Sequence, residues 1–144
     1  MADDDSDDCL LAQEALAQID LEHELHTVQD GEALMDYLYR RGSYTSLKNR
    51  SLPGLILLDL NMPRKSGMEA LQEIKSDPSL RRIPTVILTT SEMEQDVEQS
   101  YDFGANSFVT KSVSFNSLVE VVEEIGKYWL EVVQLPPETL PPHS

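Results

Sequence analysis

Two runs of apolar residues constrain the fold most, because both are too continuous for a strand with one face in water. Residues 55–60 read LILLDL and residues 84–90 read PTVILTT. Such runs are typical of parallel strands that are covered on both faces. Patterns typical of amphipathic helices separate them from each other and from a shorter strand pattern at 106–111. The sequence therefore predicts an α/β fold, in which helices cover both faces of a doubly wound parallel sheet.

The helices are predicted from their ends as well as from their apolar faces. We expect helices over 7–19, with Ser6 as N-cap and Leu10 on the buried face, over 31–42, ended by Gly42, and over 114–134. Two further helices follow capping-box patterns, Ser66 with Glu69 and Ser91 with Glu94. A weaker strand pattern covers 24–28. Only two residues precede the first aspartates, so the first strand is truncated, and we expect the chain to lack its first few residues.

Composition narrows the class of protein. The 144 residues carry 26 acidic and 11 basic side chains, a net charge of −15, which argues against nucleic acid or a membrane as the main partner. Cys9 is the single cysteine, and no signal peptide or long apolar stretch occurs, so we expect a cytoplasmic protein. Prolines cluster near the end. We predict one domain over 1–135 and a proline-rich tail over 136–144.

The opening run of aspartates has a rival interpretation as a calcium loop. Asp3, Asp5, Asp7 and Glu14 fall at the spacing of an EF-hand. Asp8, however, stands where that loop requires glycine, and no helix can precede it. We therefore assign Asp5, Asp7 and Asp8 to the first turn of a helix, where the helix dipole favours acids, without a metal role.

Polar residues follow the predicted strands at the edge where functional groups of such sheets gather. They are Asp3 and Asp4 after the first strand, Asp59, Thr89 and Lys111. A cluster of carboxylates repels itself without a cation, and oxygen ligands of this kind suit Mg²⁺. A lysine and a hydroxyl nearby could bind phosphoryl oxygens. This set is suited to forming an aspartyl-phosphate.

At these positions the sequence resembles the receiver domains of two-component response regulators. The matching segments are the acidic pair Asp3 and Asp4, LLDLNMPRKSG around Asp59, ILTTS around Thr89 and SFVTKS around Lys111. Each is weak alone, but their order and spacing are specific, and they extend over nearly the whole chain. The resemblance implies a flavodoxin-like, five-stranded sheet of order 2-1-3-4-5.

The resemblance also implies what the acidic residues do. Asp59 would accept a phosphoryl group from a phosphohistidine on a sensor histidine kinase. Asp4, Asp59 and the backbone carbonyl of Asn61 would bind Mg²⁺ directly, and Asp3 would bind it through water. Lys111 would bridge to the phosphoryl oxygen.

A second set of implied roles concerns switching. Thr89 and Phe108 match the family's switch pair, in which the hydroxyl moves to the phosphoryl group and the aromatic ring turns inward. Two departures stand out. Phenylalanine replaces the usual tyrosine, and Ser112 follows Lys111 where most receivers have proline, which leaves the conformation of that loop open.

The chain looks closest to single-domain regulators associated with phytochrome-type kinases. The features are the insertion RRGSYTSLKNRSLPG, the segment LTTSEMEQDV and the closing YWLEVVQLPP. We expect a signalling protein rather than an enzyme, without an output domain, that acts through protein contacts and could pair as a homodimer through its last helices. Two alternatives stay open. One is a haloacid-dehalogenase-type phosphatase, although Asn61 stands where its second acid belongs. The other is a constitutive interaction module.

Overall fold

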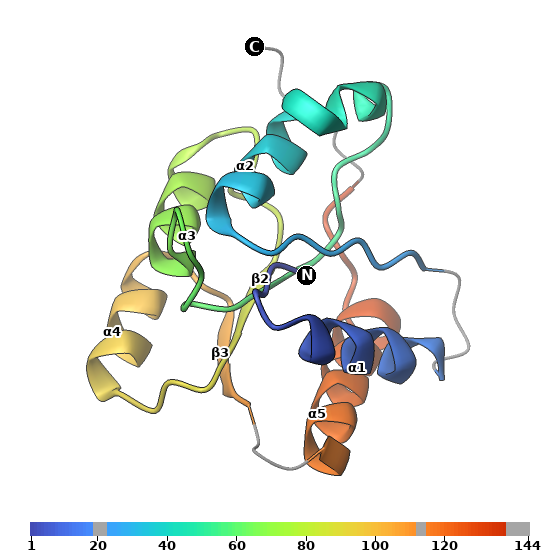
Figure 1. The fold of residues 1–144 in the computed structure, drawn as a ribbon, viewed down its shortest axis with the longest axis vertical. Coiled ribbons are helices and arrows are strands. Elements are labelled where there is room, and N and C mark those ends of the chain that lie inside the picture. The colour runs from blue at the N-terminus through green and yellow to red at the C-terminus, as the bar shows by residue number, and fades with distance from the viewer. Residues whose placement is uncertain (19–22, 112–114, 138–144) are drawn as a thin grey trace.

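A parallel sheet forms the centre of the molecule. A computed structural model describes residues 1–18, 23–111 and 115–137, without the side chains of 115–117. The strands β1 (Ile56–Leu58), β2 (Thr85–Thr89) and β3 (Ser107–Thr110) lie side by side in that order. Ala2 forms single parallel bridges to Val28 and to Leu58. Counting these two bridged segments, the order across the sheet is 2-1-3-4-5 (Figure 1).

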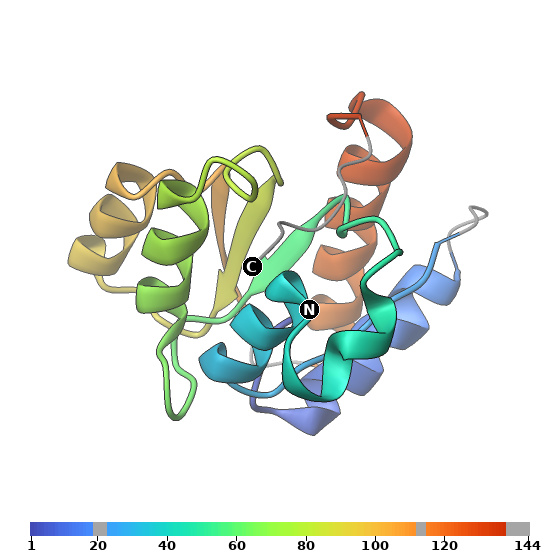
Figure 2. The same ribbon diagram turned by 90° about the horizontal axis from the view of Figure 1, so that it is seen from above.

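The helices cover both faces of this sheet, as predicted. The helices α1 (Ser6–Ala17) and α5 (Phe115–Lys127) pack together on one face. The helices α2 (Gly31–Tyr39), α3 (Gly67–Ser76) and α4 (Glu94–Asp102) lie on the other (Figures 1 and 2). Alternate strand residues enter separate apolar clusters, since Leu57 packs with the first pair of helices and Leu58 with the others. In the described part of the chain, no helix is long and apolar enough to cross a membrane.

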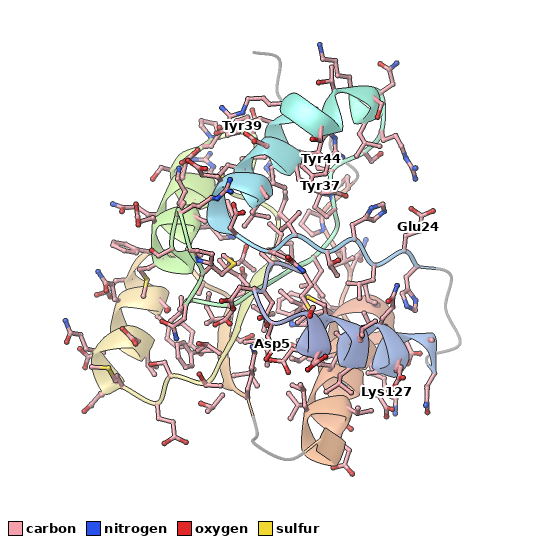
Figure 3. The ribbon with its side chains drawn as sticks, in the orientation of Figure 1. Asp5, Glu24, Tyr37, Tyr39, Tyr44 and Lys127 are labelled. Atoms are coloured by element: carbon pink, nitrogen blue, oxygen red, sulfur yellow. The ribbon has the colours of Figure 1, made fainter. Side chains whose placement is uncertain are left out.

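The start of α1 differs from the prediction by one residue. Asp5, labelled in Figure 3, is the N-cap rather than Ser6, and its carboxylate accepts from the backbone N–H groups of Asp7 and Asp8. The prediction for Leu10 was wrong, because its side chain is 59% exposed. The buried residues of α1 are instead Cys9, Ala12, Ala15 and Leu16. Residue 19, the predicted end of the helix, lies outside the described residues.

Other predicted ends were also wrong in detail. The helix α2 ends before Gly42, with Arg40 in the left-handed conformation as its C-cap, and Gly42 begins the 3₁₀ helix η1 (Gly42–Leu47). Ser91 does not cap α4. Its hydroxyl donates to Asp96 Oδ2 at 2.6 Å, and the N-cap is Met93.

Two predicted elements are interrupted or shortened. The last helix ends at Lys127 and gives way to a π-helical turn, η2 (Tyr128–Val132). The predicted strand at 24–28 contributes only the bridge at Val28. The capping box of Ser66 and Glu69 at the start of α3 is confirmed.

Two glycines, Gly31 and Gly67, allow the first turns of α2 and α3 to approach the backbone of the loop after β1 closely. A Cβ on Gly67 would lie 1.9 Å from the carbonyl oxygen of Asp59 and 2.7 Å from Leu60 Cα. A Cβ on Gly31 would lie 2.1 Å from the carbonyl oxygen of Lys65, which accepts the Gly31 N–H at 3.0 Å. Both ends of this loop are therefore packed directly against the first turn of a helix.

We expect Gly67→Ala to lower the free energy of unfolding by about 3 kcal/mol, because the added methyl group must displace backbone rather than a flexible side chain. Urea denaturation measures this. Gly54→Ala is a matched control, because a Cβ there would meet only the end of the Leu135 side chain, at 3.1 Å. Equal losses in the two variants would contradict the backbone contact.

A cavity of about 740 Å³ opens at the amino end of the sheet. Met1, Leu25, Leu55, Ile125 and Leu130 supply part of its apolar lining. Met1 lies at its edge, and its carbonyl oxygen accepts the N–H of Val28 at 2.9 Å. The cavity therefore lies where an extended backbone ahead of Met1 would run, between the segment before Val28 and the segment leading into β1.

We expect a segment of about five apolar residues fused ahead of Met1 to raise the free energy of unfolding by roughly 2 kcal/mol, because it would continue the central pairing and fill apolar space. Thermal and urea unfolding would measure this. A glycine–serine segment of equal length is the control, since it can pair but fills little volume. Equal stability of the two fusions would contradict the expectation.

Candidate functional site

The predicted functional residues meet at the carboxyl edge of the sheet. Asp59 follows β1, Thr89 ends β2 and Lys111 follows β3. The bridge of Ala2 brings the next residue, Asp3, to the same edge, because the backbone N–H of Asp59 donates to the Ala2 carbonyl at 2.9 Å. A segment of very few residues is thus enough to place the first acidic pair.

Three carboxylates form an acid cluster, which we define as Asp3, Asp4 and Asp59. One oxygen of each lies within 4.8 Å of the others. Asp3 is fully buried and Asp59 is 7% exposed, whereas Asp4 faces solvent. The backbone N–H of Asn61 donates to Asp59 Oδ1 at 3.2 Å and helps to orient that carboxylate. Three hard oxygen ligands with one side open to water fit a divalent cation.

The Lys111 ammonium lies among three carboxylates. Its Nζ is 2.6 Å from Asp3 Oδ2, 2.8 Å from Asp8 Oδ2 and 3.2 Å from Asp59 Oδ2. Only 4% of the lysine side chain is exposed. Asp8 was not predicted at this site, because the sequence places it in the first turn of a helix, where its charge suits the helix dipole. With Asp5 as the N-cap, Asp8 lies in the first turn of α1 near the strand ends, but its contact with a residue 103 positions away depends on the packing of α1.

Burial and pairing act in opposite directions on the charged groups of the site. Burial raises the pKa of the Asp3 carboxyl to about 6, although Lys111 and the backbone N–H of Asp5 oppose that rise. Burial alone would lower the pKa of Lys111, but its contacts with Asp3 and Asp8 raise it above the usual range. Lys111 is therefore a fixed positive charge, whereas the raised pKa of Asp3 lets this carboxyl hold its proton up to a pH of about 6.

This shift predicts how stability without metal depends on pH. The pKa of Asp3 is about 6 in the folded protein against an ordinary 3.8, so the folded state holds a proton between these values that the unfolded chain releases. Protonated Asp3 therefore adds to the free energy of unfolding. This addition is complete below pH 3.8 and is lost as the pH rises through about 6. Urea denaturation in a chelator should show this loss, and Asp3→Asn should remove it. If the free energy of unfolding of Asp3→Asn fell with pH as steeply as that of wild type, the loss could not be assigned to Asp3.

The residues of the predicted switch pair lie on two neighbouring strands, β2 and β3. Thr89 is fully buried at the end of β2, and its hydroxyl accepts the N–H of Ser91 at 3.4 Å. Phe108 on β3 is half-buried against the larger apolar cluster, and its backbone N–H donates to the hydroxyl of Tyr101 at 3.1 Å. Their switching roles stay predictions. The peptide after Lys111 leads into residues outside the described ranges.

The fold and the acidic edge define a class of small α/β signalling domains, and sequence comparison identifies the family. Residues 1–123 match the response regulator receiver domain. The chain therefore belongs to this family.

Several relatives are similar to this chain over most of their length. The response regulator Rcp1 of Synechocystis sp. is 45% identical over 136 residues, which are 94% of this chain and 90% of the relative. The crystal structure of the phosphorylated cyanobacterial phytochrome response regulator RcpA superposes with a TM-score of 0.88, at 47% identity, and covers 94% of each chain. The Mn²⁺-bound form of Rcp1 also gives 0.88, at 44% identity, and covers 94% of this chain and 95% of its own.

Proposed function

We propose that this response regulator accepts a phosphoryl group on Asp59 from the phosphohistidine of a sensor histidine kinase. The observation that carries the proposal is the position of Asp59 within the acid cluster and beside Lys111, whose Nζ lies 3.2 Å from Asp59 Oδ2. The similarity to the cyanobacterial phytochrome response regulator RcpA supports a phytochrome-type kinase as the partner.

In the proposed transfer, a carboxylate oxygen of Asp59 forms a bond to phosphorus while the phosphorus–nitrogen bond to histidine breaks. The electron pair of that bond stays with the imidazole nitrogen. Lys111 stabilises the negative charge of the phosphoryl oxygens, and the N–H of Asn61 holds the other carboxylate oxygen of Asp59. Thr89 donates its hydroxyl to a phosphoryl oxygen once the group is in place.

A divalent cation completes the site in this proposal. We assign Mg²⁺ to Asp4, Asp59 and the backbone carbonyl of Asn61, with Asp3 acting through water. When bound, the ion offsets the negative charge that accumulates as a phosphoryl group meets the carboxylates. The three acids fit this role by their oxygen chemistry and their proximity.

The proposed output is a changed protein-binding surface. Phosphorylation places new negative charge beside Thr89 and biases Phe108 on the neighbouring strand. The last helices offer a surface for a second copy of the chain, because Tyr128 is 54% exposed and Val132 is 73% exposed in η2. We propose that pairing through this end accompanies signalling.

The direct test uses a small phosphoryl donor in place of the kinase. Wild-type protein with acetyl phosphate and Mg²⁺ should gain one phosphate in intact mass. The added group should be lost in alkali, as an acyl phosphate is, and should not form in a chelator. A phosphate that is stable to alkali, or that forms equally well without a divalent ion, would contradict the proposal.

A further inference from the structure

Asp8 has a contact that its position in the first turn of a surface helix does not explain. Its Oδ2 accepts a hydrogen bond from Lys111 Nζ at 2.8 Å, which is shorter than the 3.2 Å from the same nitrogen to Asp59. The Asp8 side chain is 18% exposed, compared with 4% for Lys111. A buried ammonium is thus bound more closely by a helix residue than by the proposed phosphoacceptor.

Asp8 also differs from the other two partners of Lys111 in its relation to the cation site. Asp3 and Asp59 belong to the acid cluster, whose oxygens lie within 4.8 Å of one another, but Asp8 does not. A cation on the cluster therefore weakens the attraction of Asp3 and Asp59 for the lysine, because it offsets their charge. Asp8 keeps its full charge for Lys111.

The position of Asp8 is fixed by the helix that carries it. Its backbone N–H donates to Asp5 Oδ1, the N-cap, at 3.3 Å, and α1 packs along α5. The carboxylate is therefore held at one side of the lysine and cannot follow the ammonium toward a group on Asp59. The three N–H donors of Lys111 already face Asp3, Asp8 and Asp59, so a phosphoryl oxygen competes with Asp8 for them.

We propose that Asp8 is a positioning residue that holds the Lys111 ammonium when a cation is bound and competes with the phosphoryl group for it. The inference rests on the proposed function of Asp59. A phosphoryl group on Asp59 must compete with Asp8 for the N–H donors of Lys111, so this ion pair limits how far the lysine assists phosphorylation. The chain thereby carries a built-in restraint on its own activation.

The first test measures the rate of phosphorylation by acetyl phosphate with saturating Mg²⁺. We expect Asp8→Asn to react roughly three- to tenfold faster than wild type, because a charge-assisted hydrogen bond no longer competes for Lys111. Asp7→Asn is the matched control, since it removes the same charge from the same helix turn at an exposed side chain, and its rate should change little. Asp8→Glu should return the rate toward that of wild type.

A double-mutant cycle shows whether Asp8 acts through the lysine. In a Lys111→Met background, Asp8→Asn should leave the remaining rate unchanged. An equal acceleration in that background would overturn the proposal, because Asp8 would then act as a general negative charge near the site. An equal acceleration by Asp7→Asn would overturn it for the same reason.

A second measurement does not depend on phosphorylation. The Lys111 side-chain ammonium can be observed by ¹⁵N NMR and assigned by its loss in Lys111→Arg. In wild type the signal should persist when Mg²⁺ is added, whereas in Asp8→Asn it should broaden or disappear with Mg²⁺. Identical signals in the two proteins would overturn the role of Asp8. Failure of the proposed function looks different, because wild type would then take up no phosphate while this NMR difference remained.

Discussion

Asp59→Asn is expected to abolish phosphoryl uptake from acetyl phosphate, with a loss of at least about 1000-fold in rate. The amide keeps the shape of the side chain and can still accept the N–H of Asn61, but its oxygen is a far weaker nucleophile than a carboxylate. The acid cluster also loses one of its three charged ligands, so the affinity for Mg²⁺ should fall. Intact mass spectrometry and a Mg²⁺ titration followed by NMR or calorimetry measure the two effects.

The control for this variant is Asp102→Asn, which removes a carboxylate from an exposed position near the end of α4. It should gain phosphate at the wild-type rate. Labile phosphate on Asp59→Asn at a comparable level would place the acceptor elsewhere. Loss of phosphate in both variants would point to a general effect of charge rather than to a specific nucleophile.

Lys111→Met is expected to lower the free energy of unfolding by about 3–5 kcal/mol in a chelator, which is the usual cost of leaving buried charges unpaired. The methionine keeps the apolar stem but leaves the carboxylates of Asp3, Asp8 and Asp59 facing one another without a cation. Mg²⁺ should recover part of the loss and should stabilise this variant more than wild type. Urea denaturation with and without Mg²⁺ gives both values.

Lys127→Met provides the comparison, because Lys127 is an exposed residue in the last turn of α5 (Figure 3). Its stability should change by no more than about 0.5 kcal/mol, and Mg²⁺ should have the same effect as on wild type. A small loss for Lys111→Met in the chelator would mean that the carboxylates of the site relax without their lysine.

The sequence predicted the parts of the molecule that local chemistry determines. The runs around β1 and β2 are apolar on both faces, so they had to be central strands, and the residue after a central parallel strand lies at the carboxyl edge. This reasoning placed Asp59, Thr89 and Lys111 correctly at one edge of the sheet. The capping box at Ser66 was also predictable, because both of its partners lie within one turn.

Features that depend on packing between distant segments were not predictable in the same way. Asp8 meets Lys111 only because α1 begins at Ser6, with Asp5 as its N-cap, and turns that face toward the ends of the strands. Ser91 has the right spacing for a cap, but its hydroxyl donates to Asp96 instead. In both cases several local partners were compatible with the sequence, and the tertiary arrangement selected one of them.

The two glycine contacts beside β1 give the loop after β1 less freedom to move than the segment after β2. With Gly67 against Asp59 and Gly31 against Lys65, the loop that carries the proposed acceptor has helix backbone at both ends and little room to shift. On the opposite side, Thr89 leads into a mostly exposed segment that includes Thr90, Glu92 and Met93. We therefore expect a group added at Asp59 to displace the side of Thr89, toward α4 and β3, more readily than the loop between Gly31 and Gly67.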